Sequence, residues 1–369
     1  MGRPRGGHRV GPPQGQLHDN ALTVVPLPGF RHRKAVLRAQ ALSRLVHPRE
    51  EEGDDQEGQL AELRSYLIDL LDWLWRAVAE PVLRVLPFSP AGSGAASPPG
   101  IWWCPTGVFN HLPVHAATRI KDPSGPDGDS LTDRFVSSHT PTLRALKTAR
   151  EADRAASGVK RPMLLVGVGG TPPGTDLAEL HHVAAEIDAV ARLFPTARPL
   201  RDEDALRATV LRQLRAGGWF HFAGHGEQHP EEPDGLLYLW DHTTSNSLRI
   251  RDIAGLRLDK AELAFLSACQ THLAPRAHSD EPVSLAGALL LAGFRHVVAA
   301  QWQLNSLRAR HVTTRFYENL LEALTTAGHP RPAPTARDAA HALHAAVRER
   351  RRERPEAVEV WAAYVHLGP

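Results

Sequence analysis

A cysteine and a histidine each follow a short apolar run and stand among small residues. Trp219 to Phe222 leads into Ala-Gly-His-Gly at 223–226, and Leu263 to Ser267 leads into Ala-Cys-Gln-Thr at 268–271. The attacking form of a cysteine is its thiolate, and a nearby imidazole can take the thiol proton or hold it in an ion pair. The two segments therefore predict nucleophilic catalysis, with Cys269 as the nucleophile and His225 as the general base.

Glycines on both sides of the histidine support this prediction. Gly224 and Gly226 permit a sharp turn and leave the backbone around His225 uncovered. The N–H groups of Gly226 and Cys269 can then face an oxyanion that develops on a substrate carbonyl. Loss of one such donor typically raises the reaction barrier by about 3 kcal/mol. We therefore expect Gly226 and Cys269 to form an oxyanion hole.

Other interpretations of the same residues stay open. A cysteine after an apolar strand also suits the role of a small buried hydrophobe. His221 and His225 have the spacing of a zinc-binding pair, but the glutamate of a metalloprotease helix is missing between them and the segment is a strand and a turn. Ser267 precedes the exposed turn, which disfavours a serine triad. We expect no metal site and no cofactor.

A glycine-rich turn after another apolar run allows a further alternative to be tested. Gly-Val-Gly-Gly occupies 167–170, directly after the apolar run that starts at Met163. Neither a dinucleotide fingerprint nor the lysine of a phosphate-binding loop follows it. The simplest role for these glycines is the turn into the next helix.

The elements that would position His225 and Cys269 alternate between strand and helix. Apolar runs predict strands at 163–168, 219–222, 263–267 and 296–300, and the intervening periodicity predicts helices at 177–194, 204–215, 284–291, 307–324 and 336–350. Unbroken apolar strands that alternate with helices are typical of a mainly parallel sheet covered on both faces, so the expected fold class is α/β. Reactive groups in such sheets gather at the carboxyl ends of strands, which predicts that His225 and Cys269 meet at one edge.

The segments outside this alternation have a different character. Residues 1–58 are rich in Arg, His, Pro and Gly, end in an acidic run, and are predicted to be a flexible arm or linker. Leucines at helical spacing predict a helix over 59–80, which Pro81 stops or kinks. Short strands are predicted at 101–104, 114–117 and 134–138, and a polar hairpin at 227–258. We expect one domain over 59–369, with an N-terminal subregion at 59–160 and a catalytic core at 161–369.

Composition excludes several other classes of protein. A formal charge of +2 over 369 residues gives no general electrostatic reason to expect nucleic acid or membrane partners. Two cysteines, Cys104 and Cys269, cannot build a disulfide framework or a cysteine-rich zinc site. The most apolar stretch, 286–294, is far too short to span a bilayer, and no secretory signal is recognised. The expected location is a reducing cytoplasm.

The ordered motifs resemble one known family. His-Phe-Ala-Gly-His-Gly at 221–226 and Leu-Ser-Ala-Cys-Gln-Thr at 266–271 are similar to the two catalytic motifs of the CHAT family, which are caspase-like peptidase domains often joined to helical repeats. The segment 285–302 resembles the helix and strand that follow them. Upstream, 103–117 and 131–143 resemble the family's first strands and turns, and 361–368 resembles its closing segment. The likeness runs from about residue 60 to the end of the chain.

This resemblance implies a caspase-like three-layer α/β/α sandwich and peptide-bond hydrolysis through an acyl-enzyme. His225 would be the general base, Cys269 the nucleophile and Gly226 an oxyanion donor, with Gln270, Trp302, Asn305 and Ser306 as candidates for the substrate groove. It also implies a protein substrate, a role in bacterial regulated proteolysis, defence or cell death, and control by a regulatory partner or a repeat or sensor module, in trans or in a longer parent chain.

The sequence departs from the family at two points. Many relatives carry an acidic residue a few positions after the tryptophan that corresponds to Trp302, where this chain has Gln-Leu-Asn-Ser at 303–306. Because such an acid can receive a basic P1 side chain, we expect a neutral or small P1 residue, with Asp234 and Asp241 as possible substitutes for the missing acid. Gln270 also stands where an acidic residue is frequent.

Two further functions remain as alternatives to an active endopeptidase. The chain can keep the fold and act as a catalytically silent interaction module that serves as a signalling platform. Loss of either member of the dyad would have indicated such a module, and both Cys269 and His225 are present. A metal-dependent hydrolase is the remaining alternative, and the sequence offers no convincing set of ligands for it.

Overall fold

The structure is a computed structural model that describes residues 22–46, 56–86, 98–120, 129–155, 162–227, 235–243, 248–268, 284–302, 304, 306–322 and 336–369. Its centre is an eight-stranded sheet with the strand order β1-β2-β11-β10-β9-β5-β3-β4. The pair β10–β11 is antiparallel and every other neighbouring pair is parallel. The strands are β1 (Gly100–Trp103), β2 (Val136–His139), β3 (Met163–Gly167), β4 (Leu200–Arg201), β5 (Gly218–Ala223), β9 (Ala261–Ser267), β10 (His296–Ala300) and β11 (Tyr364–Leu367).

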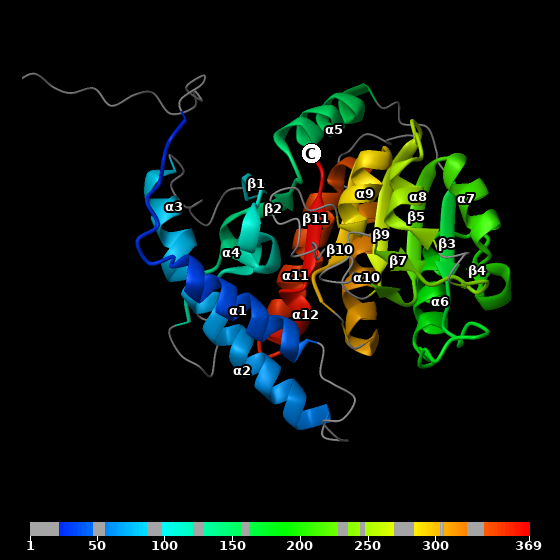
Figure 1. Ribbon diagram of the computed structural model, residues 1–369. Coiled ribbons are helices and arrows are strands. Elements are labelled where there is room, and N and C mark those ends of the chain that lie inside the picture. Colours follow the sequence, from blue (N-terminus) through cyan, green and yellow to red (C-terminus); the bar gives the residue numbers. More distant parts are fainter. Residues whose placement is uncertain are drawn as a thin grey trace, which may run out of the picture.

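Helices cover both faces of this sheet, as Figure 1 shows. The larger ones are α1 (His32–Leu45), α2 (Gln56–Leu74), α5 (Leu143–Ala155), α6 (Val183–Leu193), α7 (Arg207–Arg215), α9 (Leu285–Ala292), α10 (Ser306–Glu322) and α11 (Ala339–Glu353). The shorter ones are α3 (Glu80–Val85), α4 (Leu131–Arg134), α8 (Ile250–Ala254) and α12 (Val358–Trp361). The three-layer α/β/α architecture that the motifs implied is therefore confirmed.

Two hydrophobic cores lie on the two faces, because successive residues of a strand point to opposite sides. Along β5, Trp219 and Ala223 join the core that contains α6, α10 and α11. Phe220 and Phe222 join the core that contains α5, α7, α8 and α9. All six residues of β5 are buried, which explains why the strand is apolar without a break.

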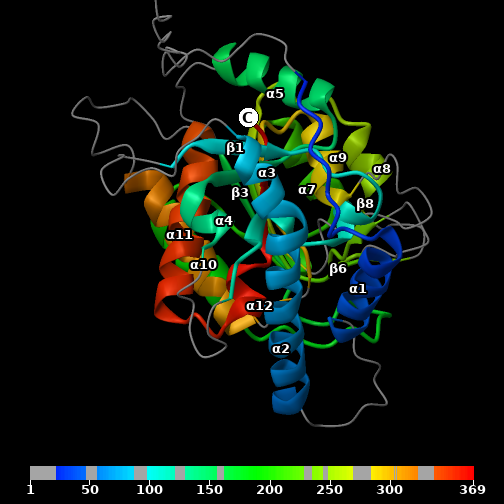
Figure 2. The same ribbon diagram turned by 90° about the vertical axis from the view of Figure 1, so that its left-hand side faces the viewer.

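The N-terminal helices form a layer beside the β1–β2 edge of the sheet (Figures 1 and 2). Within the segment predicted to be an arm, α1 buries Ala35, Ala39 and Leu42 in the same core as α2. Helix α2 does not stop at Pro81. A π-helical stretch at Trp75–Ala79 leads into α3, and Pro81 stands in the first turn of α3.

The small predicted elements need corrections. The predicted strand 114–117 is a short 3-10 helix, Val114–Ala116, because Ala116 N–H bonds back to the Pro113 carbonyl. The strand expected at 134–138 begins at Val136, after α4 has ended at Arg134. The insert after β5 contains three short antiparallel strands, β6 (Gly226–Glu227), β7 (Leu236–Leu237) and β8 (Leu248–Arg249), followed by α8.

Candidate active site

The carboxyl ends of three neighbouring parallel strands lie at one rim of the sheet. Gly167 of β3 pairs with Ala223 of β5, and Ala223 pairs with Ser267 of β9. We call the residues that follow β3, β4, β5 and β9 the carboxyl rim. His225 stands two residues beyond Ala223, and it is the one predicted catalytic side chain that falls within the described part of this rim.

The turn that carries His225 depends on a glycine without a side chain. A Cβ at Gly224 would lie 3.0 Å from the ring of Phe222 and 3.1 Å from the Val168 carbonyl oxygen. The backbone of β5 therefore passes close to β3 just before the imidazole. The Gly224 N–H bonds to the Ser267 carbonyl at 3.3 Å, which continues the β5–β9 pairing by one residue. These contacts bring His225 out of the core to a half-buried position.

A backbone carbonyl holds the imidazole of His225. Its Nε2 lies 2.7 Å from the carbonyl oxygen of Ala178. A carbonyl only accepts hydrogen bonds, so Nε2 carries the proton of this bond. In the neutral ring, Nδ1 then has the free lone pair. The carbonyl partner thus assigns the neutral imidazole to the tautomer with its proton on Nε2. The geometry gives His225 one fixed nitrogen and one that can accept a proton.

The short strand β6 continues directly from His225. The Tyr238 N–H bonds to the His225 carbonyl at 3.0 Å, and Gly226 pairs with Leu237. Hydrogen-bonded and non-hydrogen-bonded pairs alternate along an antiparallel ladder, so the Gly226–Leu237 pair is of the second kind. The N–H of Gly226 is therefore directed away from β7, as an oxyanion donor on this strand requires.

A tyrosine and a glutamate stand beside the imidazole. The Tyr238 hydroxyl donates to Glu227 at 2.5 Å, and the Tyr238 ring meets that of His225 edge to face at 6.5 Å. Burial, together with the bond to Glu227, raises the pKa of Tyr238 well above its ordinary value. The phenol therefore stays protonated, and Glu227 is an exposed carboxylate two residues after His225 that sequence reasoning did not single out.

The glycine turn after β3 is fixed by a carboxylate. Asp202 Oδ1 accepts hydrogen bonds from the N–H groups of Gly169 and Gly170, each at 2.9 Å. Asp202 has a φ of 37°, in the left-handed region that few non-glycine residues adopt. A Cβ at Gly170 would lie 3.1 Å from the Trp240 ring. The turn is thus a structural part of the rim, and both amides that a phosphate would need are already bonded.

A buried polar cluster lies beneath the carboxyl rim. Glu186, on the first turn of α6, is 1% exposed and accepts a hydrogen bond from the Ser267 hydroxyl at 3.0 Å. Its other oxygen lies 3.4 Å from Nε2 of His221, which is fully buried. Nδ1 of His221 lies 3.2 Å from the Tyr317 hydroxyl. Burial raises the pKa of Tyr317 well above its ordinary value, and the charge of Glu186 adds to this effect.

Several predicted site residues lie outside the described part of the chain or away from open surface. Cys269, Gln270 and Asn305 are outside the described residues, and so is the side chain of Ser306, whose backbone begins α10. The Trp302 side chain is 2% exposed and donates to the Glu359 carbonyl at 2.8 Å, so its ring belongs to the core.

The second cysteine has surroundings unlike those expected for a nucleophile. Cys104 is exposed at the end of β1, and its thiol lies 3.8 Å from the Pro141 carbonyl oxygen. Partial burial of the sulfur raises the pKa of this thiol above its ordinary value. Less of it is thiolate at neutral pH, so Cys104 is a poor nucleophile.

One group of side chains in the described part of the chain has the spacing of metal ligands. His311 lies on α10, and Glu349 and Glu353 lie on α11. Arg315 forms an ion pair with Glu349, and Arg350 one with Glu353. These carboxylates are thus already neutralised by arginines. The pair His221 and His225 does not converge, because His221 is in the core and His225 contacts Ala178.

Comparisons with known proteins identify one family and several similar solved structures. The CHAT domain family model matches residues 69–369. No curated protein matches the sequence. The chain is similar to the solved structure of the Arg-specific cysteine proteinase gingipain R, with a TM-score of 0.41 and 13% identity. It is also similar to the Saccharomyces cerevisiae separase–securin complex, with a TM-score of 0.48 and 15% identity. A third is the complex of pro- and mature domains of Porphyromonas gingivalis RgpB (0.49, 10%).

The alignments differ in how much of each protein they cover. The gingipain R alignment covers 63% of this chain and 53% of that one, and the separase alignment covers 94% and 23%. For the RgpB complex the shares are 91% and 76%. The chain thus spans about half of gingipain R and under a quarter of separase. No helix among the described residues has the length and apolarity needed to cross a bilayer.

Proposed function

Because the chain belongs to the CHAT domain family, we propose that it is a cysteine endopeptidase in which Cys269 attacks the scissile carbonyl and His225 is the base. The observation that carries the proposal is the register between β5 and β9. Ala223 and Ser267 are the last described partners, and His225 and Cys269 each stand two residues further along the chain. Residues at equal distances beyond a parallel pair are the ones best placed to meet.

The geometry of His225 supports a complete proton path. Nδ1 takes the proton of the Cys269 thiol while the Ala178 carbonyl holds the proton on Nε2. The thiolate adds to the carbonyl carbon, and the N–H of Gly226 bonds to the resulting oxyanion. The imidazolium then gives its Nδ1 proton to the leaving amine, the C–N bond breaks, and a thioester remains. A water molecule, deprotonated by the same nitrogen, hydrolyses the thioester and restores the thiol.

The proposed substrate preference follows from the acid that is missing after Trp302. The sequence has no carboxylate at 303–306, and Asp234 lies outside the described residues. Asp241, the other proposed substitute, accepts a hydrogen bond from the Arg207 N–H at 2.9 Å, at the start of α7. A carboxylate engaged at a helix start is poorly suited to receive a basic side chain. We therefore propose a neutral or small P1 residue, with Gln270, Asn305 and Ser306 as groove residues.

The setting of this activity is part of the same proposal. A protein substrate, a cytoplasmic location and control by a regulatory partner or sensor module, in trans or in a longer parent chain, fit a peptidase of this family. We propose that the biological role of such a peptidase lies in bacterial defence or regulated cell death. No nucleic acid, membrane or cofactor enters the proposed chemistry.

The test is cleavage of a diverse peptide library, with product termini read by mass spectrometry. We expect wild-type protein to produce cuts that Cys269→Ala and His225→Ala both abolish, with neutral or small residues at P1. Cuts that persist in both variants, or no cuts by wild-type protein alone and with its co-expressed neighbours, would contradict the peptidase and favour the silent interaction module. A P1 profile dominated by Arg or Lys would overturn the specificity alone.

A further inference from the structure

The buried cluster around Glu186 has no role in the proton path described above. The Glu186 side chain is 1% exposed, so its carboxylate is almost completely shielded from solvent. A buried carboxylate is costly unless it is hydrogen-bonded or paired, and such groups concentrate at functional sites. The partners of Glu186 come from different elements: Ser267 from β9 and His221 from β5.

The positions of these partners relate Glu186 to the dyad. Ser267 is the last residue of β9 and precedes Cys269 by two positions, while His221 precedes His225 by four positions in the same strand and turn. One carboxylate therefore bridges the two strands that lead to the proposed nucleophile and base. On the same face of the sheet, α10 contributes Tyr317, whose hydroxyl contacts the other side of the His221 ring.

The protons of this cluster can be assigned from its chemistry. A carboxylate only accepts, so Ser267 donates to Glu186. The second oxygen of Glu186 lies 3.4 Å from Nε2 of His221, and this close contact is not a hydrogen bond. The raised pKa of Tyr317 keeps its phenol protonated, so Tyr317 can donate to Nδ1 of a neutral His221. Tyr364, at the start of β11, is also kept protonated, since burial and the Glu186 charge raise its pKa.

The pKa of one more histidine, His182, depends on the charge of this cluster. His182 stands at the N-cap of α6 and is half-buried. Burial lowers the pKa of His182, the charge of Glu186 acts in the opposite direction, and positive charge on His225 lowers it further. The pKa of His182 therefore responds both to the charge of Glu186 and to that of His225.

We propose that Glu186 is a positioning residue that bridges β9 and β5 through Ser267 and His221, holds the dyad in its reactive arrangement, and acts as a charged carboxylate. This inference rests on the proposed function, because it concerns the same Cys269 and His225. It adds a residue outside the two catalytic motifs, on a helix that approaches the sheet from one face. The negative charge favours the imidazolium that forms when the thiol gives up its proton.

The decisive substitution is Glu186→Gln, which keeps the length of the side chain and an acceptor for Ser267 but removes the charge. We expect kcat/KM on the best library peptide to fall roughly tenfold or more at pH 7, since small displacements of a catalytic pair have large effects on rate. The basic limb of the kcat/KM profile should move to lower pH, because an imidazolium that forms near this cluster loses a favourable negative charge. Ser267→Ala should lower the rate and leave this limb in place.

Two matched controls separate this effect from general damage. Asp188→Asn removes a carboxylate from the same helix, where Asp188 is 57% exposed and paired with Arg201. Glu262→Gln removes a buried carboxylate from the other end of β9, where Glu262 bonds to Trp219 and Arg295. Both should leave the pH profile of the folded enzyme unchanged. A shift in either control equal to that of Glu186→Gln, or a Glu186→Gln profile identical to wild type, would overturn the inference.

A readout that needs no activity distinguishes failure of the inference from failure of the proposed function. The titration of His182, followed by NMR, should move to lower pH in Glu186→Gln and to higher pH in His225→Gln. If wild-type protein cleaves and the Glu186→Gln profile is unchanged, the inference alone fails. If no variant cleaves but His182 responds as expected, the cluster is real and the peptidase assignment fails. An unresponsive His182 contradicts the charged carboxylate directly.

Discussion

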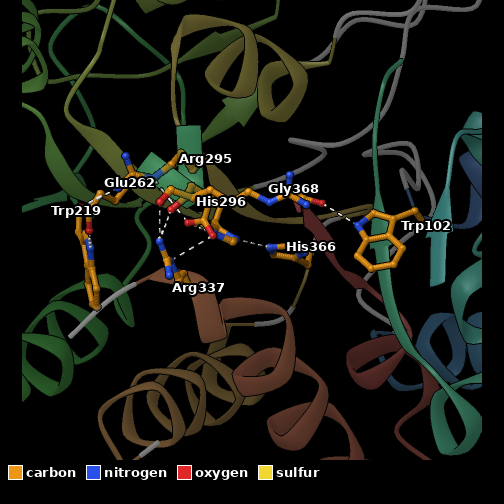
Figure 3. A network of polar contacts seen from close by, with 10 residues as sticks. Trp102, Trp219, Glu262, Arg295, His296, Arg337, His366 and Gly368 are labelled. Atoms are coloured by element: carbon orange, nitrogen blue, oxygen red, sulfur yellow. Dashed lines mark hydrogen bonds and ion pairs between the residues drawn. The ribbon is translucent and has the colours of Figure 1, made fainter. Parts of the chain in front are cut away.

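The two rims of the central sheet carry polar groups that are arranged in different ways. At the carboxyl rim, His225 is half-buried and is held at one nitrogen by Ala178. At the opposite rim, the starts of β5, β9 and β10 and the end of β11 carry a continuous buried network (Figure 3). There Glu262 contacts both Trp219 and Arg295, at 3.0 and 2.7 Å.

The opposite rim continues as a chain of histidines. Ser138 bonds to His366, His366 to His296, and His296 contacts Asp153 of α5, at 2.8, 3.0 and 3.4 Å. Burial alone would raise the pKa of Asp153, but the contacts from His296, Arg337 and Arg295 outweigh it and hold this pKa below its ordinary value. Each imidazole here has a partner on both nitrogens, whereas His225 has one at Nε2. We infer that the opposite rim stabilises the fold and the carboxyl rim performs chemistry.

The largest expected effect separates activity from stability at the carboxyl rim. His225→Ala should lower kcat/KM by roughly a thousandfold or more, because the thiol loses its base. The free energy of unfolding should change by less than about 1 kcal/mol, since the side chain is half-buried and makes one hydrogen bond. Peptide cleavage and urea unfolding of the same preparation measure both. A comparable loss of stability would show that His225 is a structural group like those of the opposite rim.

The converse is expected for the buried ion pair of the opposite rim. Arg295→Ala should lower the free energy of unfolding by about 3 to 5 kcal/mol, because it leaves the Glu262 carboxylate buried without its cation. The side chains of Arg295 and Glu262 are 7% and 4% exposed. Cleavage per folded molecule should stay within about twofold of wild type. A variant as stable as wild type, or one that is folded and inactive, would contradict the division between the rims.

The acid response of the opposite rim gives a smaller effect. Burial, and then the charges of His296 and His341, lower the pKa of His366 well below its ordinary value. The folded protein therefore keeps this ring neutral while the unfolded chain takes up a proton below pH about 6.5. Stability should fall as the pH drops from that value, by up to about 1.4 kcal/mol per pH unit from this group. In His366→Asn the free energy of unfolding should decline less steeply with falling pH. If urea unfolding from pH 8 to 5 gives wild type and His366→Asn the same slope, the assignment of this pH dependence to His366 is refuted.

The smallest effect concerns the turn that Asp202 holds at the carboxyl rim. Asp202→Asn keeps an acceptor for the N–H groups of Gly169 and Gly170 and tolerates the positive φ, so it should behave like wild type. Asp202→Ala should lose about 1 to 2 kcal/mol of stability through two unmatched donors and backbone strain. It should also raise KM, because the turn borders the rim. Identical unfolding curves for the two variants would show that the carboxylate does not hold the turn.

The sequence predicted the framework well where one interaction dominates. The strand 296–300 has the bounds that its apolar run indicates, because all five residues are buried. The helix predicted over 177–194 begins only at Val183. Residues before it cross the rim, where the Ala178 carbonyl contacts His225 and the Leu180 N–H bonds to the Gly169 carbonyl at 2.7 Å. Helical periodicity cannot reveal that these backbone groups form tertiary hydrogen bonds in place of helical ones.

The proposed site was predicted from its motifs, whereas the residues that surround it were not. His225 and Gly226 lie at the expected rim, while Ala178, Asp202 and Glu186 reach it from other segments. A signal for Glu186 was present, because it stands three residues after Val183 on the apolar face of a helix. A charged residue on that face needs a buried partner, and only the tertiary structure identifies Ser267 and His221 as those partners.

The most direct test of the account is the rate at which Cys269 reacts with a peptide acyl-electrophile in protein that also contains Cys104. We predict that modification of Cys269 is faster than that of Cys104 by roughly a hundredfold at pH 7, since an imidazole lowers the pKa of a neighbouring thiol. In His225→Ala the rate at Cys269 should fall to that of Cys104, whose rate stays the same. Equal rates at the two cysteines in wild-type protein, unaffected by His225→Ala, would contradict the proposed dyad.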